Sequence, residues 1–141
     1  MPDVNIWAVL LATLSTMVVG SIWYTPAVFG NRWMDLARID RDATEQSAVG
    51  PIVVTVIVSL ITAYVLTAAT EIVHEQFGGS FLFNALMTGL VLWAGFTASR
   101  FITHDAFERR PTALTTLNIA HELVTVVVMA LIIGAFGSAA G

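Results

Sequence analysis

The sequence predicts an all-α integral membrane protein with four transmembrane helices. Of its 141 residues, 57% are hydrophobic and only 11% are charged, whereas soluble domains are about a quarter charged. Four uninterrupted apolar runs are each long enough to cross the ~30 Å hydrocarbon core of a bilayer as a helix. These runs are about twice as long as the strands of a membrane barrel and do not alternate, which argues against a barrel.

We expect one four-helix transmembrane domain over residues 1–141. Its spans are predicted at residues 4–24, 52–70, 81–101 and 113–136. Gly50-Pro51 favours a helix start at the second span, and Pro111 lies where the first turn of the fourth span tolerates a missing N–H. Gly78-Gly79-Ser80 predicts the turn between the second and third spans. The first span lacks a preceding basic residue and a following cleavage site, so we expect a retained helix rather than a secretory signal.

The arginines predict the orientation of the chain in the cell membrane. All six lie in or beside the first and third connections: Arg32, Arg38, Arg41, Arg100, Arg109 and Arg110. The N-terminus, the second connection and the C-terminus have no arginine, and the chain has no lysine. Because positively charged loops stay on the cytoplasmic side, we expect loops 1 and 3 to be cytoplasmic and both termini to be extracytoplasmic.

The first connection, residues 25–50, is predicted to contain a short amphipathic helix at the inner membrane interface. Phe29, Trp33, Leu36 and Ala37 recur at helical spacing, while Arg32, Asp35, Arg38 and Arg41 fall on other faces. Such a segment lies at the membrane surface, either as an interfacial anchor, which we favour, or as a sensor of anionic lipid or of a partner protein. The residues expected to anchor the chain at the interface are Trp23, Tyr24, Pro26, Trp33, Arg32 and Arg100.

Small residues recur on the predicted spans at intervals of about one helical turn. The expected packing positions are Ala8, Ala12, Thr16, Gly20, Gly89 and Gly134, and a hydroxyl face on the second span consists of Thr55, Ser59 and Thr62. Lipid provides little hydrophobic drive between helices, so close packing depends on such residues. The chain has more of them than one bundle core needs. We therefore expect a homo-oligomer in the lipid bilayer.

The fourth span carries the groups that cost most to place in a bilayer. Thr115, Asn118, His121, Glu122 and Thr125 fall within an arc of about 120° on a helix. Trp93 and Thr97 of the third span are expected near the same depth. An ionisable group near the bilayer centre costs several kcal/mol and so marks a candidate functional site. The alternative is that these side chains hydrogen-bond between helices and only fix the register of the bundle.

Composition excludes several classes of function. A net charge of −4 argues against a nucleic-acid binder, and the absence of cysteine excludes thiolate nucleophiles, zinc–thiolate sites and iron–sulfur clusters. Glu71, His74 and Glu75 have a spacing that could ligate a divalent metal. A solvated helix end is the favoured interpretation, because a metal site needs further ligands. We predict no metal and no cofactor.

Three segments together resemble a known family. They are the run from Trp23 to Gly30 with the pattern Trp-Tyr-x-Pro-x-x-Phe-Gly, the sequence Trp-Ala-Gly-Phe at 93–96, and Asn118-Ile119-Ala120-His121. Over nearly its whole length the chain resembles the bacterial membrane-protein family called domain of unknown function 1761. The resemblance implies a small four-helix inner-membrane protein without an established activity. The residues that match the family pattern are Trp23, Tyr24, Pro26, Gly30, Trp33, Asn118 and His121, whereas Glu122 is not a feature of it.

Three functions stay open. The favoured hypothesis is an oligomeric channel or carrier for a proton, an ion or a small solute, with Asn118, His121 and Glu122 along the path. The alternative is a non-catalytic membrane scaffold or partner-binding protein that docks through its small-residue faces. The third is a membrane-embedded enzyme that acts on a lipid or quinone with His121 as general base. An enzyme is the least favoured, because the first two spans offer only hydroxyl groups as a second catalytic group.

Overall fold

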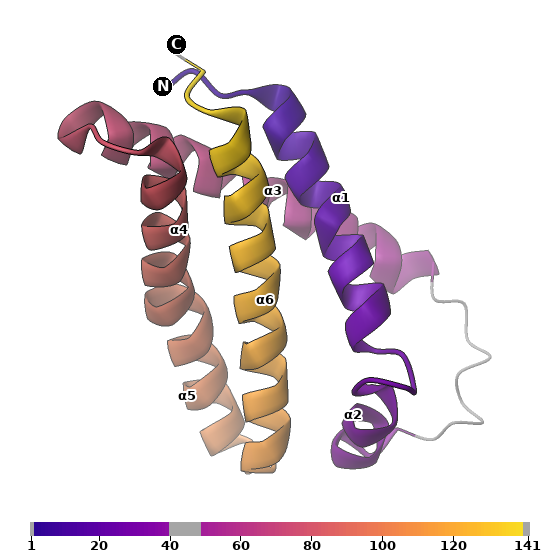
Figure 1. Cartoon of the computed structure of the whole chain (residues 1–141). Coiled ribbons are helices and arrows are strands. Elements are labelled where there is room, and N and C mark those ends of the chain that lie inside the picture. Colours follow the sequence, from indigo (N-terminus) through magenta and orange to yellow (C-terminus); the bar gives the residue numbers. More distant parts are fainter. Residues whose placement is uncertain (1, 40–48, 140–141) are drawn as a thin grey trace.

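The computed structural model describes residues 2–39 and 49–139, which form helices and contain no strand. Four helical segments are long and apolar enough to cross a membrane. They are α1 (Ile6–Trp23), α3 (Val49–Phe77), the continuous segment of α4 (Phe81–Leu92), η2 (Trp93–Ala98) and α5 (Ser99–Phe107), and α6 (Thr112–Phe136). A short helix, α2 (Gly30–Ala37), follows α1. The predicted all-α fold with four membrane-capable helices is confirmed (Figure 1).

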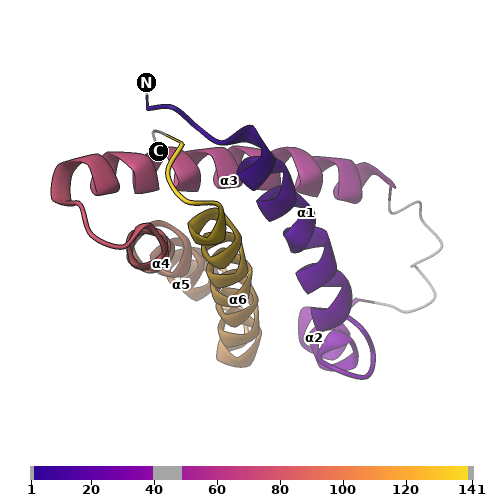
Figure 2. The same ribbon diagram turned by 45° about the horizontal axis from the view of Figure 1, so that its top comes forward.

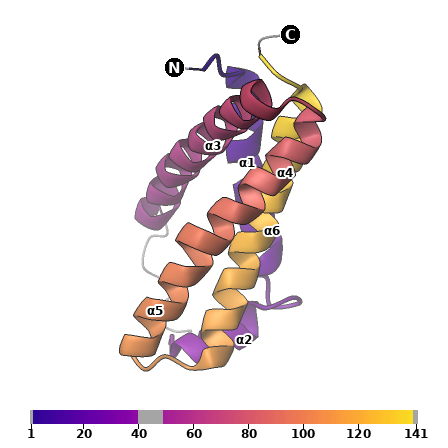
Figure 3. The same cartoon turned by 90° about the vertical axis from the view of Figure 1, so that its left-hand side faces the viewer.

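The helices form a bundle in which α3 is set apart by its direction. α6 lies between α1 on one side and α4 and α5 on the other (Figure 1). α3 crosses these helices obliquely, as Figure 2 shows from above. It diverges from α4 after the turn that joins them, so the N-terminal half of α3 stands away from α4 (Figure 3). The two termini lie at one end of the bundle, and α2 and the α5–α6 turn lie at the other.

The helix ends follow from local chemistry. The Asn5 side chain accepts hydrogen bonds from the backbone N–H groups of Trp7 and Ala8, at 3.1 and 3.3 Å, which satisfies donors of the first turn of α1. α3 continues past the predicted end at residue 70, because no helix-breaking residue precedes the Gly78-Gly79 pair. These two glycines have positive φ angles of 65° and 83°, a conformation that favours glycine and ends the helix.

The third span contains a π-helical segment, η2, that the sequence did not predict. Trp93 at its start donates a hydrogen bond from Nε1 to the backbone carbonyl of Ile119 on α6, at 3.1 Å. This bond fixes the relative depth of the two helices. Such widened turns inside α-helices are frequent at functional sites.

Small residues bring the helices together inside one copy of the chain. The buried packing positions of α1 are Ala8, Ala12 and Thr16. A Cβ atom on Gly89 would lie 3.0 Å from Val126 Cγ1, and one on Gly134 would lie 2.8 Å from Leu82 Cα, so α4 and α6 approach closely at both places. The small residues are thus used within the monomer, which removes the packing argument for a homo-oligomer; the homo-oligomer stays a prediction.

After α1 the chain turns back into the short helix α2. Gly30 is buried in this turn, where a Cβ atom would collide with the backbone carbonyl of Tyr24, so the close approach requires glycine. The ring of Trp33 on α2 packs on the ring of Tyr24, with centroids 5.2 Å apart. Arg41, predicted to lie in the same connection, is outside the described residues.

The structure corrects the interpretation of Glu71. The sequence favoured a solvated helix end, but Glu71 is only 1% exposed. Its carboxylate accepts hydrogen bonds from Ser138 Oγ at 2.7 Å and from the backbone N–H of Ala139 at 2.8 Å. The interpretation was wrong because α3 continues past residue 70 and meets the segment that follows α6. Glu71 thus ties the C-terminal half of α3 to that segment.

Gly134→Ala is expected to destabilise the bundle, because the added Cβ atom meets the backbone of Leu82. Overpacking of this kind costs about 1–3 kcal/mol. Gly95→Ala is the matched control, since nothing lies within 4 Å of its Cβ position. Thermal unfolding in detergent should have a lower midpoint for Gly134→Ala and not for Gly95→Ala. Equal midpoints for the two variants would contradict the close α4–α6 approach.

Glu71→Ala is expected to release the segment that follows α6, because two donors lose their acceptor. A hydrogen bond to a charged group is worth about 1.5–3 kcal/mol. Hydrogen exchange of the Ala139 amide should be faster in Glu71→Ala than in the wild type. Glu75→Ala, which changes an exposed residue of the same type one turn further along, should leave this exchange rate unchanged. If both variants exchange at the wild-type rate, the carboxylate does not hold the segment.

Candidate functional site

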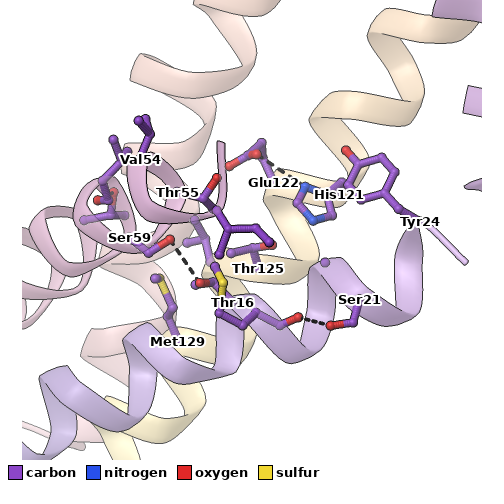
Figure 4. Close-up of a pocket in the computed structure, with 16 residues that line it drawn as sticks. Thr16, Ser21, Tyr24, Val54, Thr55, Ser59, His121, Glu122, Thr125 and Met129 are labelled. Carbon is purple, nitrogen blue, oxygen red and sulfur yellow. Dashed lines mark hydrogen bonds and ion pairs between the residues drawn. The ribbon is translucent and has the colours of Figure 1, made fainter. Parts of the chain in front are cut away.

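A cavity of about 860 Å³ lies between α1, α3 and α6 (Figure 4). Its size is within the range of about 300–1,000 Å³ that ligand pockets span. Its polar lining residues are Thr16, Ser21 and Tyr24 from α1 and its end, Thr55, Ser59 and Thr62 from α3, and His121, Glu122 and Thr125 from α6. The cavity thus brings hydroxyl groups of α1 and α3 opposite the ionisable pair of α6.

The cavity exists because α3 contacts the bundle along only part of its length. Residues 49–58 of α3 are exposed, whereas Ser59 is buried. At the crossing of α1 and α3, Thr16 Oγ1 donates a hydrogen bond to Ser59 Oγ at 3.0 Å. Between this bond and the end of the bundle where the termini lie, the helices pack around an apolar cluster that includes Met129. The cavity ends at this cluster.

His121 is enclosed by aromatic rings from the end of α1. The centroid of its ring lies 5.0 Å from that of Tyr24 and 5.7 Å from that of Trp23. The ring of Phe29 packs on Trp23 with centroids 4.5 Å apart, which holds the turn in place. The Trp-Tyr-x-Pro-x-x-Phe-Gly pattern therefore builds an aromatic wall around the imidazole.

The two nitrogens of His121 have different surroundings. Nδ1 lies 3.3 Å from Oε1 of Glu122. Nε2 is buried without a hydrogen-bond partner among the described residues, and it faces α1 at Gly20, where a Cβ atom would lie 3.9 Å away. Buried polar atoms nearly always have a partner. Among the described residues, His121 thus has a partner at one nitrogen and none at the other.

Glu122 provides the negative charge of the cavity wall. Its side chain is 36% exposed, compared with 14% for His121, so a ligand in the cavity can reach the carboxylate. No arginine and no second acid lines the cavity within the part of the chain that the structure describes.

Thr125 adds a second unsatisfied group. It is 8% exposed, and its Oγ1 lacks a hydrogen-bond partner in residues 2–39 and 49–139. Thr55 and Thr62, in contrast, donate to the carbonyl groups of Pro51 and Val58 on their own helix, at 2.8 and 3.0 Å. A donating hydroxyl keeps lone pairs that can accept. The cavity is therefore rich in hydrogen-bond acceptors.

The structure divides the predicted polar stripe of α6 among several places. Its residues in the cavity are His121, Glu122 and Thr125. Thr115 instead donates a hydrogen bond to Oδ2 of Asp105 on α5, at 2.7 Å. Trp93 and Thr97 line a smaller cavity of about 360 Å³ beside α3 and α4. Asn118 is half-buried and lines neither cavity. An arc of about 120° on one helix is wide enough to face two neighbours.

Trp23 and Tyr24 have a contact that the sequence analysis missed. We predicted them as interface anchors, and both rings also pack on His121. The Trp-Tyr pair at the end of the first span was a visible signal, but its pattern does not indicate which helix the rings meet. Among the other predicted anchors, Trp33 is half-buried, whereas Pro26, Arg32 and Arg100 are exposed.

The acidic end of α3 does not assemble a metal site. Among the described residues, no group of three or more His, Asp or Glu side chains is arranged to hold a metal ion. Glu71 binds the segment after α6, and Nδ1 of His74 lies 3.2 Å from Nδ2 of Asn84. Glu71 and His74 thus have different partners, and Glu75 is exposed.

The comparisons with known proteins give a family and nothing closer. No curated protein and no solved structure matches the chain. A family model described as protein of unknown function (DUF1761) matches residues 7–134. The match extends from the first turn of α1 to the last turn of α6 and confirms the resemblance seen in the sequence. This four-helix membrane protein belongs to the DUF1761 family.

Proposed function

We propose that the protein is a membrane carrier that binds a small cation in the cavity between α1, α3 and α6. The observation that carries the proposal is the wall of the cavity: the carboxylate of Glu122, several hydroxyl oxygens, and no arginine among the described lining residues. Carboxylate and hydroxyl acceptors complement the charge of a cation. An anion would be repelled by Glu122, and this repulsion is stronger in a medium of low dielectric constant.

The aromatic wall supports the same choice of ligand. The faces of aromatic rings carry negative partial charge and attract cations, and Tyr24 lines the cavity. We assign His121 a positioning role. Its Nδ1 contacts the carboxylate of Glu122, while the rings of Tyr24 and Trp23 hold the imidazole.

The shape of the cavity supports a carrier rather than an open channel. On one side the cavity is bordered by the exposed N-terminal half of α3. On the other side it ends at the packed cluster beyond the bond between Thr16 and Ser59. A binding site that the packed cluster closes toward one end of the bundle fits one state of a carrier better than it fits an open channel.

We further propose that the α2 end of the bundle faces the cytoplasm and that both termini face the outside of the cell membrane. Arginines gather at this end, on and after α2 and in the α5–α6 turn: Arg32, Arg38, Arg109 and Arg110. Positively charged loops are retained on the cytoplasmic side. The cavity lies within one copy of the chain, so the carrier does not depend on a homo-oligomer.

The other two functions have less support. A scaffold was expected to dock through small-residue faces, and on α1 the small residues Ala8, Ala12 and Thr16 are buried within the chain. An enzyme with His121 as general base would need a substrate atom within hydrogen-bond reach of the basic nitrogen. Nε2 of His121 is buried against α1 at Gly20, and Nδ1 faces Glu122.

Glu122→Gln is expected to abolish most of the transport, because it removes the charge that pairs with the cation and keeps the shape of the side chain. The assay measures the current that a tetramethylammonium gradient drives in proteoliposomes on a solid-supported membrane. A hydrogen bond or contact to a charged group is worth about 1.5–3 kcal/mol, so the current should fall by at least about tenfold.

Glu75→Gln is the matched control, because Glu75 is exposed and lies outside the cavity; it should transport as the wild type does. The proposal is wrong if wild-type proteoliposomes carry no more current than protein-free liposomes. It is also wrong if folded Glu122→Gln transports at the wild-type rate.

Thr125→Val is expected to stabilise the protein and to weaken transport. Valine has a similar shape and removes a buried hydroxyl without a described partner, a group that costs about 1–3 kcal/mol. Thr67→Val is the control: Thr67 is also buried, but it donates to the carbonyl of Ala63 at 2.8 Å and lies outside the cavity. The midpoint of thermal unfolding should be higher for Thr125→Val than for Thr67→Val. The tetramethylammonium current should be lower for Thr125→Val than for Thr67→Val. A lower midpoint for Thr125→Val than for Thr67→Val would contradict an unsatisfied hydroxyl.

A further inference from the structure

A second, smaller cavity continues the first along α3. It has a volume of about 360 Å³ and lies between α3, α4 and η2, and Val126 of α6 also lines it. No charged side chain from the described residues lines it, and its polar lining residues are Thr62 and Thr97. We call it the apolar groove, and its larger lining residues are Ile61, Val65, Leu66, Leu92, Trp93 and Phe96.

The apolar groove and the cavity meet at Thr62 and Val126, which line both. Val126 follows Glu122 by about one helical turn, or ~6 Å along the axis of α6. α3 covers both spaces, the cavity with residues from 52 to 62 and the groove with residues from 61 to 66. The two spaces therefore adjoin at Thr62 and Val126, within about one helical turn of Glu122 along α6.

The apolar groove borders the hydrocarbon of the bilayer. α3 and α4 diverge from their common turn (Figure 3), and the side chains of Ile61, Val65 and Phe96 at the groove are exposed. In a membrane, exposed apolar side chains of a span face lipid chains rather than water. A small hydrated solute gains no contact from such a groove. A hydrocarbon chain matches its lining.

We propose that the cation is the headgroup of a single-chain amphiphile, with its positive charge against Glu122 and its hydrocarbon chain in the apolar groove. The headgroup assignment rests on the proposed function, and the chain assignment rests on the groove and its junction with the cavity. Charge complementarity at one end and an uncharged apolar lining at the other identify a long-chain alkylammonium ion as the class of ligand.

The test uses dodecyltrimethylammonium that carries a diazirine at the end of its chain, photolysed with the protein in nanodiscs. Crosslinked residues are mapped by mass spectrometry. We expect the crosslinks to concentrate on residues 61–66 and 89–97, and an excess of unlabelled dodecyltrimethylammonium to suppress them. Glu122→Gln should lower them as well, because the headgroup loses its counter-charge.

Ile61→Trp is the variant that fills the groove, and it should lower these crosslinks by about tenfold. Ile57→Trp is the matched control. Ile57 lies one turn away on the same helix with a similar exposed fraction, 53% against 59% for Ile61, and it does not line either cavity. It should leave the crosslinks unchanged.

Tetramethylammonium, which has the headgroup without the chain, separates the two possible failures. Crosslinks that spread evenly over lipid-facing residues such as Leu14 and Val18, or that do not respond to Ile61→Trp, would overturn the chain assignment. In that case a tetramethylammonium current that still depends on Glu122 leaves the cation site standing. Loss of that dependence as well overturns the proposed function together with the amphiphile.

Discussion

α3 is fixed to the bundle from Ser59 to Glu71, and polar bonds mark both ends of this contact. At one end Thr16 donates to Ser59; at the other the buried carboxylate of Glu71 accepts from Ser138 and Ala139. Small side chains between them, such as Ala63, allow close approach. Residues 49–58 at the start of α3 have no such attachment, and this part of the helix stands away from α4 (Figure 3). The cavity lies beside the unattached start of α3, and the apolar groove lies where α3 and α4 diverge (Figure 3).

The cost of unpaired polar groups in lipid makes the site distinct from the rest of the bundle. No water is available in the bilayer core, so a polar group must find a partner within the protein. Most hydroxyls do so on their own helix, as when Thr13, Thr67 and Thr70 donate to the carbonyl four residues earlier. Nε2 of His121 and Oγ1 of Thr125 have no such partner among the described residues. A ligand bound at Glu122 would offset the cost of placing a carboxylate in a span. An amide side chain at the same position would fix the helix register at lower cost.

The four spans and the polar residues of α6 could be predicted because a bilayer imposes helix length and penalises charge. The partners of those residues could not. Helical periodicity gives the direction of a side chain around its own axis, but the neighbour it meets depends on how the helices cross. The crossing of α3 is set by contacts between distant parts of the chain, Thr16 with Ser59 and Glu71 with Ser138. For the same reason the sequence did not separate Trp93 from Glu122, place Trp23 against His121, or recognise that Glu71 is buried.

The arginines provide a physical reason for access through the bilayer. Those on α2 and in the α5–α6 turn lie at one end of the bundle, so a free cation that approached from water at that end would meet a positive field. That field extends about one Debye length, ~8–10 Å, into the solution, and it attracts the anionic lipids of the leaflet. The hydrocarbon chain of a cationic amphiphile adds a favourable hydrophobic contribution that offsets this repulsion. In the proposed complex its chain lies in the apolar groove between α3 and α4, and its headgroup lies against Glu122 on the other side of Thr62. Lateral access therefore reconciles a negative cavity wall with a positively charged end of the same small protein.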